Sequence, residues 1–299
     1  MSSLAILGSL PAHFSVTESS VGVLVVRSSL ARELAEFGFD LESDGRTRAV
    51  ALSGRRPMRL LSLAGRDYVV RRFTHGGLLR WLTRERFLDA ERPFRELAMS
   101  ETLLQRGIAT PAVLAARARR IPGGGWGLDL ITERIVGSVD GGELLARWKA
   151  RSVPPRHRRT LLSQLGRFVA RVHEVGFLHA DLHPKNVLLD EAALERGELS
   201  AWLIDLDRSV WRERLSDLER QSNLRRMWRY VARRVERGEY DVTVRDALRF
   251  LHGYEPRTSQ RKLLARAIAR GHARGAALHR LGWSLEAKGA SRSPGKPAN

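Results

Sequence analysis

The stretch His179-Ala-Asp181-Leu-His-Pro-Lys-Asn186, followed downstream by Ile204-Asp205-Leu-Asp207, decides how this sequence folds. It sets a carboxylate and an amide oxygen five residues apart, and it adds a second carboxylate directly after the short apolar run Ala201–Ile204. Mg²⁺ prefers such hard oxygen ligands, and a carboxylate beside a hydroxyl can accept its proton. The pattern therefore indicates phosphoryl transfer, with Asp181 as the base and with Asn186 and Asp205 as metal ligands.

Each of these residues also has a plain structural explanation. Asp181 could cap a helix, His179 could be a core histidine, and residues 205–207 could form an ordinary turn after a strand. The joint pattern argues against that explanation, because the residues come in the right order, behind a helix and flanked by two strands.

The two flanking strands are expected to pair with each other. Val187–Leu189 and Ala201–Ile204 are short apolar runs on either side of the polar connection Asp190–Ser200. An antiparallel hairpin of these strands would bring the loop and Asp205 together.

The N-terminal half is typical of a small antiparallel sheet with one helix. Short β-branched and apolar runs alternate with glycine turns, and one later segment has apolar residues at helical spacing. The expected strands are Val21–Val26, Ala49–Leu52, Met58–Leu63, Tyr68–Phe73, Val113–Arg119 and Leu128–Ile135, and the expected helix is Glu91–Gln105.

The C-terminal half is predicted to be helical. The expected helices are Gly141–Trp148, Arg156–Val175, Trp211–Val235 and Gln260–Leu285. The order of elements predicts an α+β, bilobal fold that resembles a protein kinase. We expect a nucleotide-binding lobe at residues 1–135, a helical catalytic lobe at 136–288 and a disordered tail at 289–299.

The sheet should supply the groups that hold a nucleotide. A bilobal kinase needs a basic residue on the third strand paired with a helix glutamate, and Arg71 and Glu96 fill these roles in the expected strand and helix. Arginine stands where lysine is usual; it can still clamp phosphates, although it could also be a surface residue of an edge strand. Gly54 is the candidate for a phosphate-covering turn or a simple hairpin, and Glu133 lies where backbone groups would bind adenine.

Four segments together resemble the lipopolysaccharide core kinases, most of all the kinases of 3-deoxy-D-manno-octulosonic acid (Kdo), with the heptose kinases next. The similarity runs from about residue 45 to about residue 235. The segments are Arg71-Arg-Phe-Thr-His-Gly76-Gly77-Leu, Arg92-Pro-Phe-Arg-Glu96-Leu, the His179–Asn186 loop and Ile204-Asp-Leu-Asp-Arg208.

This resemblance implies an ATP- and Mg²⁺-dependent kinase with Asp181 as the base, and with Arg71 and Glu96 as the nucleotide-anchoring pair. Asp207 replaces the glycine of the protein-kinase Asp-Phe-Gly segment, and would bind a second metal or orient the sugar. His183 stands where serine/threonine kinases carry a phosphate-contacting lysine, and Lys185 would take part of that role. Protein substrates are therefore disfavoured.

The charge of the chain points to anionic partners. Lys and Arg number 52 against 33 Asp and Glu, a formal net charge of +19, although a GC-rich genome could also inflate arginine. The resemblance implies Kdo–lipid A as the substrate in an anionic inner-membrane surface. The arginines of the expected helix 211–235 are candidates for membrane or substrate contact, or simply form its solvated outer face: Arg225, Arg226, Arg229, Arg233 and Arg234.

The location should be cytoplasmic, peripheral at the inner face of the inner membrane. The sequence has no cysteine, no signal-peptide pattern and no apolar run near the roughly 20 residues of a spanning helix.

Other functions remain open. A heptose kinase or a small-molecule phosphotransferase would use the same catalytic residues on another acceptor. A pseudokinase or a basic nucleic-acid-binding protein is the non-enzymatic alternative; nucleic acid is disfavoured because no recognition motif or aromatic-interleaved basic stretch is visible. The acceptor hydroxyl and the oligomeric state stay undetermined.

Overall fold

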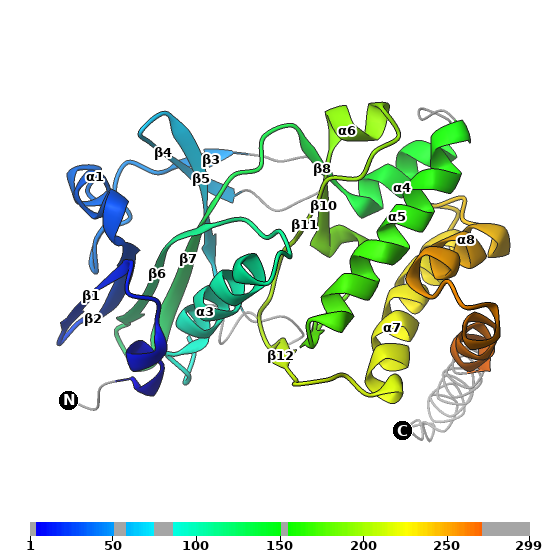
Figure 1. Ribbon diagram of the computed structural model, residues 1–299. Coiled ribbons are helices and arrows are strands. Elements are labelled where there is room, and N and C mark those ends of the chain that lie inside the picture. Colours follow the sequence, from blue (N-terminus) through cyan, green and yellow to red (C-terminus); the bar gives the residue numbers. More distant parts are fainter. Residues whose placement is uncertain (1–3, 51–57, 75–85, 151–154, 271–299) are drawn as a thin grey trace, which may run out of the picture. The chain divides into compact units, whose positions relative to one another are not determined.

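The computed structural model describes residues 4–50, 58–74, 86–150 and 155–270. The chain divides into two compact units (Figure 1). Unit 1 comprises Met1–Gly141, Lys185–Ala193 and Ser200–Trp211, and unit 2 comprises Gly142–Pro184, Leu194–Leu199 and Arg212–Asn299. The lobe limits expected from the sequence, at residues 135 and 288, stay a prediction.

Unit 1 is built on a seven-stranded antiparallel sheet in the order β1-β2-β6-β7-β5-β4-β3. The strands are β1 (Phe14–Ser19), β2 (Gly22–Arg27), β3 (Arg48–Val50), β4 (Met58–Leu63), β5 (Arg66–Arg72), β6 (Val113–Arg120) and β7 (Trp126–Glu133). Before and between them lie the short helices η1 (Ala5–Ser9), η2 (Ser28–Leu30) and α1 (Ala31–Glu36) and the longer helix α3 (Arg92–Gln105).

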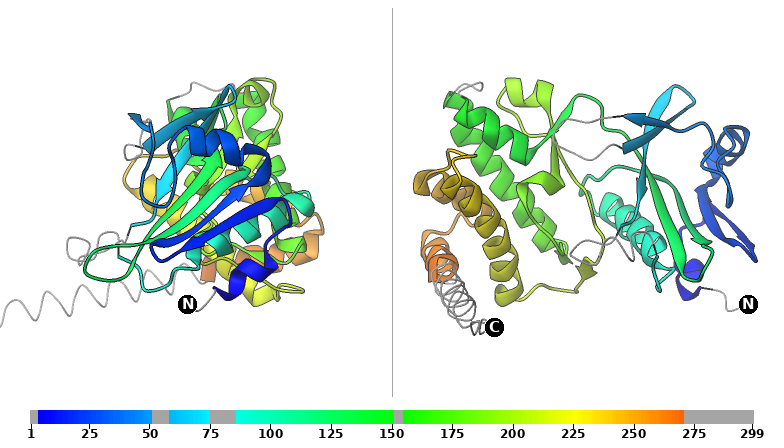
Figure 2. Two further views of the ribbon diagram at one scale, coloured as in Figure 1. Left: turned by 90° about the vertical axis from the view of Figure 1, so that its left-hand side faces the viewer. Right: turned by 180° about the vertical axis from the view of Figure 1, so that it is seen from behind.

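Both faces of this sheet are covered. Figure 2 shows α3 lying along one face, where Phe94 and Leu97 pack on apolar side chains of β6 and β7. On the other face Leu34 of α1 and Phe39 pack against Leu61 and neighbouring residues. The predicted mixed α+β fold with an antiparallel sheet is confirmed, although the sequence analysis missed β1 and α1.

Strand alternation sends the two consecutive arginines of β5 to opposite faces. Arg72 binds Asp129 (Nε to Oδ1, 2.9 Å) and Asp44, in a cluster with the fully buried Arg117. Burial alone would raise the pKa of Asp44, but Arg117 and Arg72 outweigh it and hold the pKa well below its ordinary value. Arg72 is thus committed to the core, and Arg71 is left to face α3.

A second, smaller sheet of unit 1 has the order β11-β10-β8. Its strands are β8 (Ser138–Asp140), β10 (Val187–Asp190) and β11 (Ala201–Leu203). The predicted hairpin is confirmed, with Val187 opposite Leu203 and Leu189 opposite Ala201. The connection, expected to be only polar loop, contains the short helix α6 (Glu191–Glu195).

Unit 2 is helical, with α4 (Gly141–Lys149), α5 (Pro155–Glu174), α7 (Asp217–Glu236), α8 (Val244–Tyr254) and a further helical stretch at 258–270. The short elements β9 (Phe177–Leu178), η3 (Pro184–Asn186) and β12 (Val210–Trp211) complete the chain.

The predicted helix from Trp211 begins only at Asp217, because Ser216 and Glu219 form a capping box there. Helix α8 was not predicted, and of the expected helix 260–285 only the part up to residue 270 lies within the described residues.

Two glycines let α5 and α8 pack backbone to backbone. A Cβ atom on Gly166 would lie 2.0 Å from the carbonyl oxygen of Phe250, and one on Gly253 would lie 1.8 Å from that of Ser163. Any side chain at either position would push the helices apart. This close contact fixes the register of α8 on α5, and therefore the position of Tyr254 at the end of α8.

Candidate active site

The loop that carries Asp181 leaves β9 through a buried histidine. His179 is fully buried, and its Nδ1 accepts a hydrogen bond from the backbone N–H of Asp181 at 3.1 Å. Its ring also meets the edge of Phe177, with centroids 6.3 Å apart. His179 is therefore a core residue that also shapes the turn, while the Asp181 side chain is 56% exposed.

A chain of hydrogen bonds connects three helices to this loop. His173 of α5 lies 2.8 Å (Nδ1) from the Tyr254 hydroxyl and 3.0 Å (Nε2) from Oδ1 of Asn223. Asn223 of α7 then donates its Nδ2–H to the carbonyl of His179 at 2.7 Å. We refer to Tyr254, His173, Asn223 and His179 as the loop anchor.

The directions of these bonds follow from the chemistry of each group. Since the amide of Asn223 donates to His179, its oxygen faces His173, whose Nε2 must donate. Nδ1 of His173 then accepts from Tyr254. Burial lowers the pKa of His173 to about 4 and raises the pKa of Tyr254 to about 12, so the imidazole is neutral and the phenol is protonated at neutral pH.

Two donors flank the Asp181 carboxylate. Nε2 of His183 lies 3.3 Å from Oδ2, and Nη1 of Arg226 lies 3.4 Å from Oδ1. His183 is stacked on Tyr230, with ring centroids 4.4 Å apart and planes at 18°. Because Asn223 fixes α7 against the loop, Arg226, about one turn further along α7, is placed beside the carboxylate.

The second group of site residues belongs to unit 1. Glu96 of α3 is buried, pairs with Arg71 of β5, and accepts the backbone N–H of Leu206 at 3.1 Å. Arg71 also reaches Asp205, with Nη1 and Oδ1 2.5 Å apart. Burial raises the pKa of Glu96 against the opposing effect of Arg71, whereas Glu96 and Asp205 outweigh burial and raise the pKa of Arg71.

Asp205 has an unusual backbone. Its φ is +60°, in the left-handed region that Asp tolerates better than most residues. The conformation lets Asp205 reach Arg71 while the next N–H, that of Leu206, bonds to Glu96. Such positions occur at functional sites, where the surrounding bonds hold the strain.

The hairpin brings Asn186 and Asp205 to the same end of the small sheet. Asn186 directly precedes β10 and is buried, and its carbonyl accepts the N–H of Ile204, which precedes Asp205, at 3.0 Å. One amide oxygen and one carboxylate fit Mg²⁺, which typically takes one or two carboxylates together with substrate phosphates. The described residues hold no cluster of three or more His, Asp or Glu side chains suited to a metal.

The remaining predicted site residues have other surroundings. The carboxylate of Asp207 is gripped by Arg92 of α3, with Nε and Oδ1 3.2 Å apart. Glu133 ends β7, and its N–H already donates to Ala112 at 2.8 Å. Lys185 lies in η3, and Gly54 falls outside the described residues.

Sequence reasoning missed two residues of the site, Asn223 and Arg92. For Asn223 the available signal was a polar residue on the inward side of an amphipathic helix.

Comparison with known proteins identifies the family of the chain. A sequence model of the lipopolysaccharide kinase (Kdo/WaaP) family matches residues 43–254. The chain belongs to this family. It is therefore a kinase that phosphorylates a sugar hydroxyl in lipopolysaccharide biosynthesis, and its predicted resemblance to the family is confirmed.

Individual relatives of this lipopolysaccharide kinase cover most of the chain. It is 29% identical over 222 residues to a 3-deoxy-D-manno-octulosonic acid kinase of Xylella fastidiosa strain 9a5c, covering 71% of this chain and 80% of the relative. A kinase of the same name from Actinobacillus succinogenes is 26% identical over 66% of this chain and 79% of its own. The solved structure "WaaP in complex with acyl carrier protein" shares the fold, with a TM-score of 0.54 at 22% identity, covering 77% of this chain and 88% of that chain.

The loop anchor makes stability depend on pH. The pKa of His173 lies near 4 in the fold against 6.5 for the free side chain, so the unfolded chain takes up the proton first. The contribution of neutral His173 to the free energy of unfolding is complete above pH 6.5. It falls as the pH drops and is fully lost below about pH 4. Urea unfolding should show that the free energy of unfolding falls by about 2 kcal/mol between pH 7.5 and pH 5. His173→Gln, which does not titrate, should not show this loss, and an unchanged loss in that variant would contradict the assignment.

The Arg71–Glu96 pair should appear as a strong coupling in a double-mutant cycle. Arg71→Met leaves the buried Glu96 carboxylate uncompensated and should cost about 3 kcal/mol of unfolding free energy. Glu96→Gln in the same chain removes that charge. The double variant should therefore be about 1–2 kcal/mol more stable than the summed effects of the two single variants predict. Arg66→Met, on an exposed arginine of the same strand, serves as the control. Additive effects at Arg71 and Glu96 would mean that the two are not paired.

Proposed function

We propose that the protein transfers the γ-phosphoryl group of ATP, with Mg²⁺, to a hydroxyl of a Kdo residue on lipid A, at the cytoplasmic face of the inner membrane. The observation that carries the choice of acceptor is Arg226, whose guanidinium lies 3.4 Å from the Asp181 carboxylate. An acceptor hydroxyl at Asp181 would bring its sugar against this cation. Kdo is an acidic sugar, so its carboxylate can form an ion pair with Arg226, whereas a neutral heptose has no anionic group for such a pair. The names of the relatives support the same acceptor.

In this proposal Asp181 is the base. It accepts the proton of the acceptor hydroxyl while the hydroxyl oxygen forms a bond to the γ-phosphorus and the bond to the β-phosphate oxygen breaks, which releases ADP. His183 and Arg226 orient the carboxylate from either side. The loop anchor holds its backbone through His179.

Unit 1 would hold the nucleotide. Arg71, aligned by Glu96, is placed to clamp phosphate oxygens, and Asn186 with Asp205 would hold the metal. When bound, Mg²⁺ offsets the negative charge that gathers on the phosphates. Asp207 acts through Arg92 in this arrangement, because that arginine grips both of its oxygens. Arg71, which stands in place of the usual lysine, thus has two carboxylate partners, Glu96 and Asp205.

The experiment is a phosphate-transfer assay of the purified protein with radiolabelled ATP, Mg²⁺ and Kdo–lipid A. We expect labelled glycolipid from the wild type and a drop of at least about 10³-fold for Asp181→Asn, since an amide cannot accept the proton. Asp190→Asn, on a carboxylate outside the proposed site, is the matched control. If only a heptose-bearing acceptor is labelled, the acceptor sugar is heptose and not Kdo. Equal rates for Asp181→Asn and the wild type would overturn the assignment of the base.

Arg226 can be tested separately. Arg226→Gln removes a charge-assisted contact of about 1.5–3 kcal/mol, so KM for Kdo–lipid A should rise about 10- to 150-fold with KM for ATP unchanged. With an acceptor whose Kdo carboxyl is reduced to an alcohol, the variant and the wild type should behave alike. A fall in kcat that is equal for both acceptors would instead show that Arg226 only orients Asp181.

A further inference from the structure

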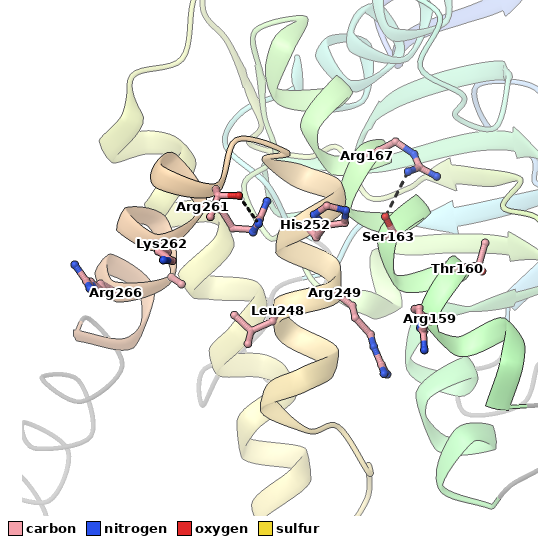
Figure 3. Close-up of a pocket in the computed structure, with 12 residues that line it drawn as sticks. Arg159, Thr160, Ser163, Arg167, Leu248, Arg249, His252, Arg261, Lys262 and Arg266 are labelled. Carbon is pink, nitrogen blue, oxygen red and sulfur yellow. Dashed lines mark hydrogen bonds between the residues drawn. The ribbon is translucent and has the colours of Figure 1, made fainter.

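A strongly basic groove lies in unit 2 between α5, α8 and the helical stretch 258–270 (Figure 3). Its volume is about 800 Å³, and none of its lining residues is acidic. Its cationic side chains are Arg159, Arg167, Arg249, Arg261, Lys262 and Arg266, and His252 also lines it. We call this the basic groove.

Some of these cations are occupied by the fold itself. Arg249 pairs with Asp246 at 3.1 Å, and Arg261 donates to the carbonyls of Glu255 and Pro256 at 3.0 and 2.8 Å. Arg159, Lys262 and Arg266 have no ion-pair partner among the residues that the structure describes. They present uncompensated positive charge around a concave surface, which attracts anions.

Exposed apolar side chains accompany this charge. Leu248 on α8, which lines the groove, is 47% exposed, and Leu263 on the next helix is 56% exposed. One turn before Leu248 on α8, Val244 is 71% exposed. Cationic helices that also expose leucine are typical of segments that lie at a membrane interface, with the cations at the headgroups and the apolar side chains below them.

The groove is separate from the loop that carries Asp181. Its α5 residues, Arg159 to Arg167, belong to the first two thirds of that helix, whereas the Asp181 loop follows the last turn. From Arg167, the last α5 residue of the groove, to Glu174 the helix rises about 10 Å at about 1.5 Å per residue. One wall of the groove, the stretch 258–270, also lies beyond the family match at residues 43–254. The groove therefore need not take part in phosphoryl transfer.

We propose that the basic groove is the surface by which the protein docks on an anionic phospholipid bilayer. Its arginines and Lys262 bind headgroup phosphates, for which the planar guanidinium offers two parallel hydrogen bonds, and Leu248 and Leu263 enter the interface. The inference deepens the proposed function, since it rests on an acceptor that is held in a membrane. Charge complementarity selects this occupant, because the groove is lined by cations and the bilayer surface carries anionic headgroups.

The test is co-sedimentation of the full chain with vesicles. We expect binding to vesicles that contain phosphatidylglycerol, none to pure phosphatidylcholine, and a steep loss with rising NaCl. The triple variant Arg159→Gln, Lys262→Gln, Arg266→Gln should bind on the order of 100-fold more weakly, at about 1 kcal/mol for each charge near the surface. Leu248→Ser with Leu263→Ser should weaken binding that persists at high salt.

A matched control removes the same charge elsewhere in unit 2. Arg196, Arg214 and Arg237 are exposed, and their change to Gln lowers the net charge equally without touching the groove or the arginines of α7 named above. This control should bind vesicles like the wild type. Equal loss in both triple variants, wild-type binding by the groove variant, or tighter binding to single-stranded DNA or an acidic protein than to vesicles would each overturn the proposal.

Phosphate transfer to a short, lipid-free Kdo acceptor separates this proposal from the proposed function. The groove variant should keep wild-type activity on that acceptor and lose it on vesicle-embedded Kdo–lipid A. An enzyme that binds vesicles through the groove but transfers no phosphate to either acceptor would leave the docking surface standing and would remove the proposed function.

Discussion

A buried imidazole that must stay neutral is the constraint on which the Asp181 loop depends. His173 can serve both Tyr254 and Asn223 only as the tautomer that carries its proton on Nε2, because Asn223 has already committed its amide to His179. Protonation would turn the acceptor into a second donor facing the Tyr254 hydroxyl. The position of the Asp181 loop is thus set by four groups on separate segments of the chain, Tyr254, His173, Asn223 and His179.

The arrangement around Arg71 and Glu96 follows from a different constraint, the alternation of side chains along a strand. Two consecutive arginines on β5 must face opposite ways, and the cluster of Asp44, Arg117 and Asp129 takes Arg72. Arg71 is then directed at Glu96, a buried carboxylate that also holds the backbone beyond Asp205. One glutamate therefore links a strand, a helix and the segment that carries Asp205, which explains how an arginine can stand where lysine was expected.

The parts of the site that could be read from the sequence are local ones. The loop spacing from Asp181 to Asn186 and the apolar strand before Asp205 need only neighbouring residues, and the hairpin between them was predicted for that reason. Asn223 could not be found in this way, because its partner His179 lies 44 residues away. The buried site of Arg117 depends on Asp44 and Asp129, which are also distant in the sequence. Helix α8 was missed although its sequence carries helix signals, a capping box of Thr243 and Asp246 and apolar residues at helical spacing.

The glycine contact between α5 and α8 separates two requirements on the chain. Tyr254, the last residue of the family match, is also the last residue of α8 and the first member of the loop anchor. The match to the family therefore ends at the same residue as the loop anchor. The contact of Gly166 and Gly253 fixes Tyr254 whatever sequence follows it, so the cationic side chains of the stretch 258–270 answer to a separate requirement, the membrane on which we propose that the protein docks.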